Sequence, residues 1–173
     1  MSHRVALFIA VVVMAAGLVV GTGGVGRVAQ TPHISADTTK AAGQYGLILG
    51  GCNDCHTPGW AQSGGKLAPS EWLTGNSMGY RGPWGTSYAY NLRLALRKMT
   101  EDEFVAACRK PPAKIAHPPM PWVNLALANE QDLRAMYRFV KGLGPKGDPA
   151  PEFVPPDQEP KTPYVSFAPV TPK

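Results

Sequence analysis

The residues most suited to chemistry lie in the segment Cys52-Asn53-Asp54-Cys55-His56. Two thiols three residues apart on one helical turn reach the two vinyl groups on one edge of a porphyrin, and the adjacent imidazole points under the ring toward its iron. Cys52 and Cys55 are therefore candidates for covalent haem attachment, and His56 is a candidate iron ligand. The expected cofactor is one covalently bound haem c.

Three other interpretations of the cysteine pair fit the sequence less well. A zinc ribbon needs a second Cys/His pair, but Cys108 has no partner cysteine and His117 stands alone. A thioredoxin-like redox pair needs a βαβ context with strand signals, which the sequence lacks. A purely structural cysteine pair would not require His56. Haem attachment is the favoured interpretation.

A second iron ligand is expected among the methionines. Met120 lies in Pro119-Met120-Pro121, where the prolines stiffen an extended backbone that can hold a thioether at a fixed distance from iron. Met78, in a glycine-rich loop, and His117 remain alternatives, and His117 also suits a hydrogen-bond donor at the pocket edge. His/Met ligation leaves no open iron position, which favours electron transfer over ligand binding or oxygen chemistry.

Further side chains are candidates for lining the haem pocket or meeting the haem propionates. An arginine near a propionate would form a charge-assisted hydrogen bond, although such an arginine is more often simply at the surface. The aromatic residues fit an ordinary core equally well. These cofactor-binding candidates are Arg81, Trp84, Tyr88, Asn91 and Trp122. Cys108 is expected to pack as a small buried apolar residue on the helix face that carries Phe104.

Length and composition set wider bounds. The 173 residues suffice for one compact domain with extensions, and 44% hydrophobic residues are compatible with a globular core. The net charge of +5 is small and scattered. It does not form the basic stripe with interleaved aromatics that is typical of nucleic-acid binding, so no nucleic-acid partner is expected.

The N-terminus has the order of features expected of an export signal. A basic start at residues 1–4 precedes an apolar run from Val5 to Val20 and a Gly/Thr-rich stretch to Gly26. A spanning helix needs roughly 20 apolar residues, a length reached only by including the glycines. Residues 1–26 are either a cleaved signal peptide or a membrane anchor spanning residues 5–26. Export predicts a periplasmic location or the outer face of the cytoplasmic membrane.

The elements that must position the haem motif are predicted to be helices. Residues 27–36 look like a linker, and Asp37 is a candidate cap for a helix over residues 38–51. Thr100 and Glu103 form a predicted capping box that opens another short helix.

The strongest helical pattern follows Asn129, a candidate cap for a helix over residues 130–142. Its apolar residues recur at helical spacing: Leu133, Met136, Tyr137 and Val140. This helix is expected to cross the one over residues 38–51, where the small Gly43 and Gly46 would allow close approach.

Two segments lack helical periodicity. Residues 57–93 are loop-like with aromatic anchors, which a large apolar haem disc would allow to pack. Residues 145–173 contain nine prolines and are either disordered or an extended strap, dispensable for haem attachment. The clustered Tyr164, Val165 and Phe167 are expected to dock on the protein's own core or on a partner. The predicted fold is all-α: a small helical bundle around one haem, with a Pro-rich extended C-terminal tail.

Several segments occur in one order with the closing helix: Gly43–Gly46, Cys52–Pro58, Gly82–Leu92 and Pro119–Trp122. Together they resemble the single-haem bacterial cytochrome c family, especially the cytochrome c subunits or modules of membrane-associated dehydrogenases. The resemblance implies a cytochrome c domain over residues 37–144, with Met120 at the family's ligand position. The chain departs from the family at Asn91-Leu92-Arg93-Leu94, where members often read Asn-Ile-Thr-Pro.

The resemblance also implies a function. The chain would be an electron-transfer protein rather than an enzyme, carrying single electrons between exported or membrane-bound redox partners. Those partners would be a dehydrogenase, reductase or oxidase, met freely or in a larger membrane complex. The alternative is a haem enzyme or gas sensor with an open iron site, and the presence of Met120 argues against it.

Overall fold

The structure, a computed structural model, describes residues 33–168. The expected signal or anchor at residues 1–26 lies outside the described residues, as does the linker as far as residue 32. Within residues 33–168, no helix is long and apolar enough to span a membrane.

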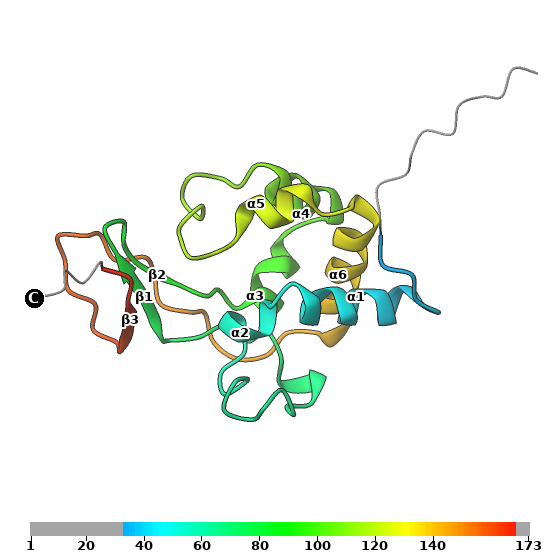
Figure 1. Ribbon diagram of the computed structural model, residues 1–173, viewed down its shortest axis with the longest axis horizontal. Coiled ribbons are helices and arrows are strands. Elements are labelled where there is room, and N and C mark those ends of the chain that lie inside the picture. Colours follow the sequence, from blue (N-terminus) through cyan, green and yellow to red (C-terminus); the bar gives the residue numbers. More distant parts are fainter. Residues whose placement is uncertain (1–32, 169–173) are drawn as a thin grey trace, which may run out of the picture. The chain divides into compact units, whose positions relative to one another are not determined.

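Two helices, α1 (Thr39–Leu49) and α6 (Glu130–Leu143), cross each other as the sequence predicts (Figure 1). Gly43 makes the close crossing sterically feasible. A Cβ atom at that position would lie 2.1 Å from the backbone oxygen of Ala135 and 2.9 Å from the Cβ of Phe139. The two helix backbones therefore meet where only a glycine fits.

Side-chain caps fix the starts of these helices. The Oγ1 of Thr38 accepts a hydrogen bond from the backbone N–H of Ala41 at 3.1 Å, so Thr38 rather than the expected Asp37 caps α1. The Oδ1 of Asn129 accepts from the backbone N–H of Gln131 at 2.8 Å, which confirms the predicted cap of α6.

The predicted capping box is also confirmed. It opens α4 (Glu101–Arg109), where the Thr100 hydroxyl accepts from the backbone N–H of Glu103 at 3.2 Å. In return, the backbone N–H of Thr100 donates to the Glu103 carboxylate at 2.7 Å. The shorter helical elements are α2 (Cys52–His56), η1 (Pro69–Glu71), α3 (Leu92–Ala95), η2 (Leu96–Lys98) and α5 (Trp122–Leu127).

A three-stranded sheet corrects the all-α prediction, because the fold is mixed α/β. Strands β1 (Gly79–Gly82) and β2 (Gly85–Tyr88) form an antiparallel hairpin, and β3 (Tyr164–Ser166) pairs parallel to the other edge of β1. The hairpin strands have only four residues each, too few for a period-two pattern to stand out. The third strand comes from the tail, so its pairing depends on contacts that no local pattern reports.

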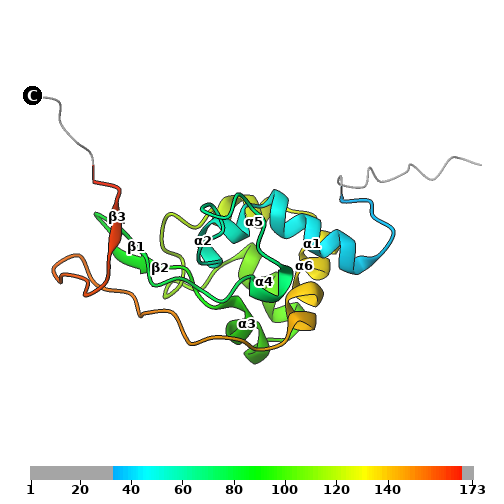
Figure 2. The same cartoon turned by 90° about the horizontal axis from the view of Figure 1, so that it is seen from below.

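The tail forms an extended segment, here called the C-terminal strap (residues 145–168). Figures 1 and 2 show it leaving the end of α6, running past α3 and reaching the sheet. The side-chain amide of Asn91 donates to the backbone oxygens of Lys146 and Asp148, at 2.8 and 3.0 Å. Of the two readings of the tail, the structure has the extended one, docked on the chain itself through β3.

The core lies among the helices and the loop that follows α2. Leu73 and Leu133 are fully buried, and Cys108 is buried as predicted. The other members of the core cluster are Leu47, Trp72, Leu96, Val105, Met136, Tyr137, Phe139 and Val140. Five of these core residues also line a cavity that includes residues of α2: Leu47, Leu96, Cys108, Met136 and Val140.

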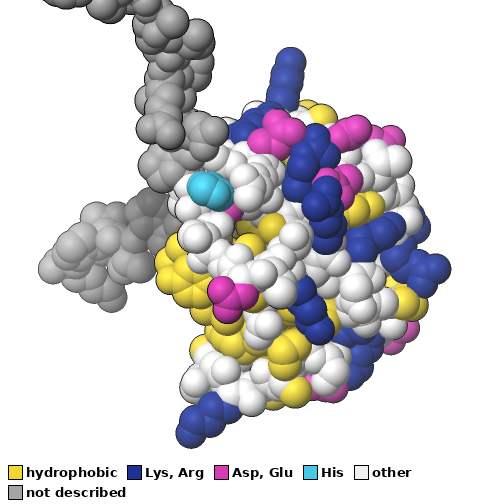
Figure 3. All heavy atoms as spheres, turned by 90° about the vertical axis from the view of Figure 1, so that its right-hand side faces the viewer, with side chains coloured by type: hydrophobic (Ala, Val, Ile, Leu, Met, Phe, Trp, Pro, Cys, Tyr) yellow, Lys and Arg dark blue, Asp and Glu magenta, His cyan; other side chains and the backbone are white. Residues whose placement is uncertain are grey.

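Charged side chains tie α4 to α6. The Glu101 carboxylate accepts hydrogen bonds from Arg138 at 2.8 Å and from Arg134 at 3.1 Å, and Arg134 also pairs with Asp102 and Glu130. Figure 3 shows the face of the molecule at the right of Figure 1, on which basic and acidic side chains lie next to one another. Two of the acidic residues at the start of α4, Glu101 and Asp102, are thus engaged by α6.

Candidate functional site

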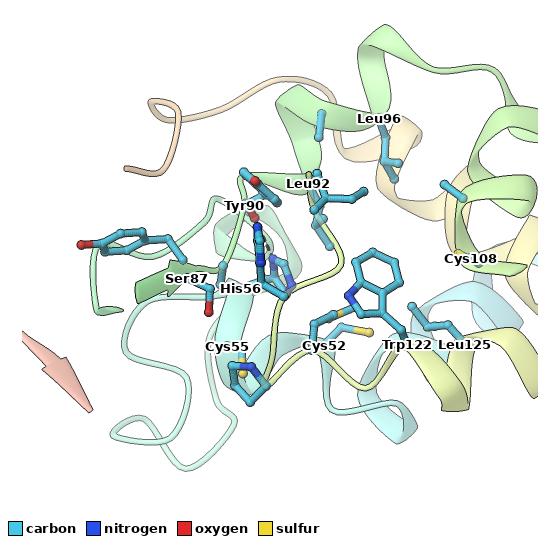
Figure 4. Close-up of a pocket in the computed structure, with 18 of the residues that line it drawn as sticks. Cys52, Cys55, His56, Ser87, Tyr90, Leu92, Leu96, Cys108, Trp122 and Leu125 are labelled. Atoms are coloured by element: carbon cyan, nitrogen blue, oxygen red, sulfur yellow. Dashed lines mark hydrogen bonds between the residues drawn. The ribbon is translucent and has the colours of Figure 1, made fainter. Parts of the chain in front are cut away.

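The short helix α2 presents the predicted haem-attachment residues. Gly51 precedes it with φ +65°, a left-handed conformation that lets the chain turn sharply from α1 into α2. Cys52 and Cys55 are free thiols and line the cavity together with His56 (Figure 4). One helical turn therefore places both thiols and the imidazole on the same wall.

His56 is held in one orientation by a backbone contact. Its Nδ1 lies 2.7 Å from the backbone oxygen of Tyr90, drawn as the dashed line in Figure 4. A carbonyl oxygen can only accept, so Nδ1 carries the proton and Nε2 keeps its lone pair. Burial lowers the pKa of His56, against the opposing effect of the Tyr90 carbonyl. The ring is therefore neutral at physiological pH, the state needed for a metal ligand.

Two of the three thiols that line the cavity wall, Cys52 and Cys108, are kept neutral by burial. Burial, with a smaller contribution from Cys108, raises the pKa of Cys52 to about 12. Burial likewise raises the pKa of Cys108 to about 11. A thioredoxin-like redox pair needs a thiol with a lowered pKa, so this environment does not suit that chemistry.

The cavity is mostly apolar. Its volume is about 170 Å³, and it opens to solvent on one side. Cofactor and ligand sites are typically lined by hydrophobic and aromatic side chains with a few polar groups, and this lining has that character. The aliphatic and aromatic lining includes Leu47, Leu92, Leu96, Phe104, Leu125 and Val140.

Another part of the cavity wall comes from the loop that carries Met120. Met120 lines the cavity and is half-buried, and its backbone oxygen accepts from the N–H of Trp122 at 2.9 Å. The hydroxyl of Ser87, on β2, donates to the backbone oxygen of Pro118. The loop is thereby held between the sheet and α5.

Trp122 carries an unsatisfied donor into this space. Its Nε1 is buried and has no hydrogen-bond partner among the described residues. Figure 4 shows the indole projecting among Leu96, Cys52 and Leu125. A buried N–H without an acceptor costs about 1–3 kcal/mol, so an acceptor on a bound group would relieve that cost. Haem brings two carboxylates, and the donor set of this cavity fits it.

The cavity brings together six of the nine predicted cofactor-binding residues: Cys52, Cys55, His56, Tyr88, Met120 and Trp122. The other three are described residues that lie outside its lining, namely Arg81, Trp84 and Asn91. Asn91 instead caps α3 and holds the C-terminal strap. Arg81 and Asn91 have hydrogen-bond partners where they lie, whereas Trp84 has a ring contact but no hydrogen-bond partner for its Nε1 among the described residues.

Arg81 and Trp84 serve the sheet. The Arg81 guanidinium donates to Thr86 Oγ1 at 3.1 Å, to the backbone oxygen of Gln158 at 2.9 Å and to the Glu159 carboxylate at 3.0 Å. The Trp84 ring packs on Phe167 with ring centroids 5.9 Å apart. Both residues attach the strap to the hairpin.

The alternatives for the second ligand are separated by position. Met78 is an exposed residue of the described chain, and it is not among the residues that line the cavity. His117 does line the cavity, where its ring stacks on Phe153 with centroids 4.0 Å apart. Met120 and His117 therefore remain near the site, and Met78 does not.

Some lining residues had no sequence signal. Tyr90 acts through its backbone oxygen, which any residue type would supply. Phe153 and Pro151 reach the cavity from the Pro-rich tail, far along the chain from the motif. Ser87 belongs to a hairpin strand that the sequence pattern did not predict. Ser87, Pro151 and Phe153 are brought to the cavity by pairing between distant segments, which leaves no local pattern.

Searches of protein-family models, curated proteins and solved structures returned no match to this chain. The assignment of the site therefore depends on its own geometry.

Proposed function

We propose that this protein is a c-type cytochrome that carries single electrons. Cys52 and Cys55 would form the two thioether bonds to one haem, and His56 Nε2 would ligate its iron. One observation carries the proposal. Beside two free thiols, in the wall of an apolar cavity, the Tyr90 carbonyl fixes His56 as the tautomer with a ligating Nε2.

Met120 is the proposed second ligand. It lines the cavity, on a loop held by the Ser87 hydroxyl. The unpartnered Trp122 Nε1 is the proposed donor to a haem carboxylate. Both assignments use groups that face the cavity.

Haem c supplies an iron that gains or loses one electron. The residues of this chain set how readily it does so. The Tyr90 carbonyl hydrogen bond orients the imidazole and raises its basicity as a ligand. The apolar lining keeps water out and disfavours added positive charge, which raises the reduction potential. A thioether ligand from Met120 acts in the same direction.

The proposed partners are exported or membrane-bound redox proteins, a dehydrogenase, reductase or oxidase, met freely or inside a membrane complex. This part rests on the export pattern of residues 1–26 and on the resemblance to cytochrome c modules. The proposed location is the periplasm or the outer face of the cytoplasmic membrane.

Expression in a bacterium that matures c-type cytochromes tests the attachment. Haem should remain with the chain after denaturation and acidic solvent extraction. Cys52→Ala combined with Cys55→Ala should abolish this retention, because no thioether can form. Cys108→Ala is the matched control, since it removes the third thiol in the cavity and should leave attachment intact. A wild-type chain without covalent haem would overturn the proposal.

A second experiment tests the ligand and the function together. The reduced protein should show a six-coordinate low-spin spectrum that carbon monoxide leaves unchanged at neutral pH. Met120→Ala should open the site to carbon monoxide and lower the reduction potential, whereas Met78→Ala should change neither. Rapid carbon monoxide binding by the wild type would instead indicate a haem enzyme or gas sensor with an open iron site.

A further inference from the structure

The C-terminal strap forms part of the cavity wall. Pro151 and Phe153 line the cavity, although they follow the last helix by several residues. The Phe153 ring stacks on the ring of His117, with centroids 4.0 Å apart and planes within 10°. His117 lies three residues before Met120 in the same loop. The strap therefore touches the loop that would supply the second ligand.

Backbone hydrogen bonds of the next residue hold Phe153 against the hairpin. The adjacent Val154 exchanges two backbone hydrogen bonds with Thr86, at 2.7 and 2.9 Å. Gly85, at φ +109°, lets the strap come this close. A Cβ atom there would lie 2.4 Å from the Val154 oxygen and 2.8 Å from the Phe153 ring. The hairpin thus fixes the ring that faces His117.

Further contacts anchor the strap on both sides of Phe153. Before it, Asn91 binds the backbone oxygens of Lys146 and Asp148. After it, the Tyr88 hydroxyl shares a 2.8 Å hydrogen bond with Thr162. The strap is therefore attached to the domain on both sides of Phe153, and Phe153 contacts the Met120 loop.

We propose that Phe153 is a positioning residue for the second iron ligand, and that the strap braces the Met120 loop against the cavity. This rests on the proposed function. A thioether is a weak ligand, so it stays bound only where the surrounding structure holds it in place. The loop is clamped between the Ser87 hydroxyl at Pro118 and the Phe153 ring at His117. Removing one side of that clamp lets the loop open.

The test uses the haem-loaded full chain with Phe153→Ala. Loss of one aromatic stack should raise the open-loop population, and with it the rate of carbon monoxide binding, by about threefold to tenfold. The visible band of methionine-bound oxidised haem should weaken and the reduction potential should fall. Hydrogen exchange should accelerate in the loop over residues 113–120 and leave α1 unchanged.

Phe167→Ala is the matched control. Phe167 is a second aromatic residue of the strap, but it packs on Tyr80 and Trp84 at the sheet. It should leave carbon monoxide binding and potential at wild-type values. Phe153→Tyr keeps the stacked ring and should restore wild-type behaviour. His117→Ala should reproduce Phe153→Ala, and the double variant should add little, because both remove the same contact.

The outcomes separate this proposal from the one it rests on. Covalent low-spin haem in all variants, with Phe153→Ala indistinguishable from Phe167→Ala, would overturn the positioning role and leave the cytochrome assignment standing. A wild-type chain that never attaches haem would overturn both. A Phe153→Ala chain that fails to fold is replaced by Phe153→Leu, which keeps apolar bulk without the stack and should show the same direction of change.

Discussion

The two walls of the cavity are built differently. The motif wall, α2 with its supporting helices α1 and α6, is held by close helix packing and by caps a few residues away in sequence. The loop wall, the Met120 loop with β2 and the C-terminal strap, is held by contacts between distant segments, such as Ser87 with Pro118 and His117 with Phe153. Rigid local geometry serves one side and long-range bracing serves the other.

This difference matches the demands on the two sides under the proposed function. On the motif side, two thioether bonds and one iron ligand would come from a single helical turn. The two thiols and the imidazole must therefore be fixed relative to one another, which a short helix provides. The second ligand is a single weak bond, so small shifts of its loop change the potential and the access of small molecules. We expect substitutions in the motif wall to change the free energy of unfolding. Substitutions in the loop wall should instead change the reduction potential and the access of small molecules.

The largest expected effect lies at the crossing of α1 and α6. Gly43→Ala places a Cβ 2.1 Å from the Ala135 backbone oxygen, so the helices must separate. We expect a loss of about 3 kcal/mol in the free energy of unfolding, measured by denaturant titration. Gly142→Ala is the control: it lies in α6 with nothing within 4 Å, and should gain about 0.5–1 kcal/mol. Equal effects at both glycines would contradict the close packing.

The next effect concerns Arg93, where the chain departs from the cytochrome c pattern. Arg93 is 6% exposed and donates to the backbone oxygens of Gly144 at 2.6 Å, of Ser70 at 2.7 Å and of Leu143. It therefore caps the end of α6, where unsatisfied carbonyls collect.

Arg93→Ala should lower the free energy of unfolding by about 2 kcal/mol, because three partly buried backbone acceptors lose a charged donor. Arg97→Ala, a few residues on but exposed, should cost less than about 0.5 kcal/mol. Thermal unfolding of the two variants makes the comparison. Similar costs would mean that the Arg93 contacts contribute little.

The sequence predicted the motif wall better than the loop wall. The cap at Asn129, the capping box at Thr100 and the crossing of α1 and α6 follow local patterns, and all three are present. The sheet was missed because its strands have three or four residues, and β3 lies far along the chain from its partner β1. Long-range pairing of short segments leaves no periodicity to read.

The same reason explains which site residues were misplaced. Arg81 and Trp84 were assigned to the cavity by residue type, but they bind the C-terminal strap, whose place beside the hairpin no local pattern predicts. Phe153 was overlooked because it lies among prolines. Cys52, Cys55 and His56 needed no such context, since one helical turn fixes their relative positions.

A smaller effect is expected from the ion pairs between α4 and α6. Hydrogen bonds from Arg138 and then Arg134 lower the pKa of Glu101, against the effect of desolvation. A lowered pKa in the folded state gives stability that is complete above the unfolded value of about 4.3 and is lost as pH falls through the folded value.

Glu101→Gln should therefore be less stable than the wild type above pH 5, by about 1 kcal/mol or less because the pair is partly solvated. The difference between the two proteins should shrink as pH falls below about 4. Chemical unfolding at pH 6 and pH 3.5 measures it. A difference that is independent of pH would mean that the Glu101 charge is not what stabilises the contact.

The smallest expected effect is on the rate at which redox partners meet the protein. It concerns the basic residues that precede the Met120 loop. The stretch from residue 93 to residue 114 is rich in basic residues, and its acidic residues are Glu101, Asp102 and Glu103. Instead, α6 engages the first two, and Lys110 and Lys114 are exposed without an ion pair among the described residues. Lys114 directly precedes the cavity-lining Ile115, and Lys110 lies four residues before Lys114, so both charges are on the segment that leads to the cavity.

If that charge attracts partners, electron exchange with an anionic redox reagent should slow as salt rises from roughly 10 to 200 mM, because the screening length shortens several-fold. Lys110→Glu with Lys114→Glu should slow it about two- to fourfold at low salt, with little change in potential. The same two reversals should speed exchange with a cationic reagent.

Lys40→Glu, on α1 and away from the cavity lining, is the single-charge control and should have a smaller effect per charge. A rate indifferent to both salt and reversal would mean that partners dock through apolar contact, for which the exposed Val123 and Leu127 of α5 are the nearest candidates.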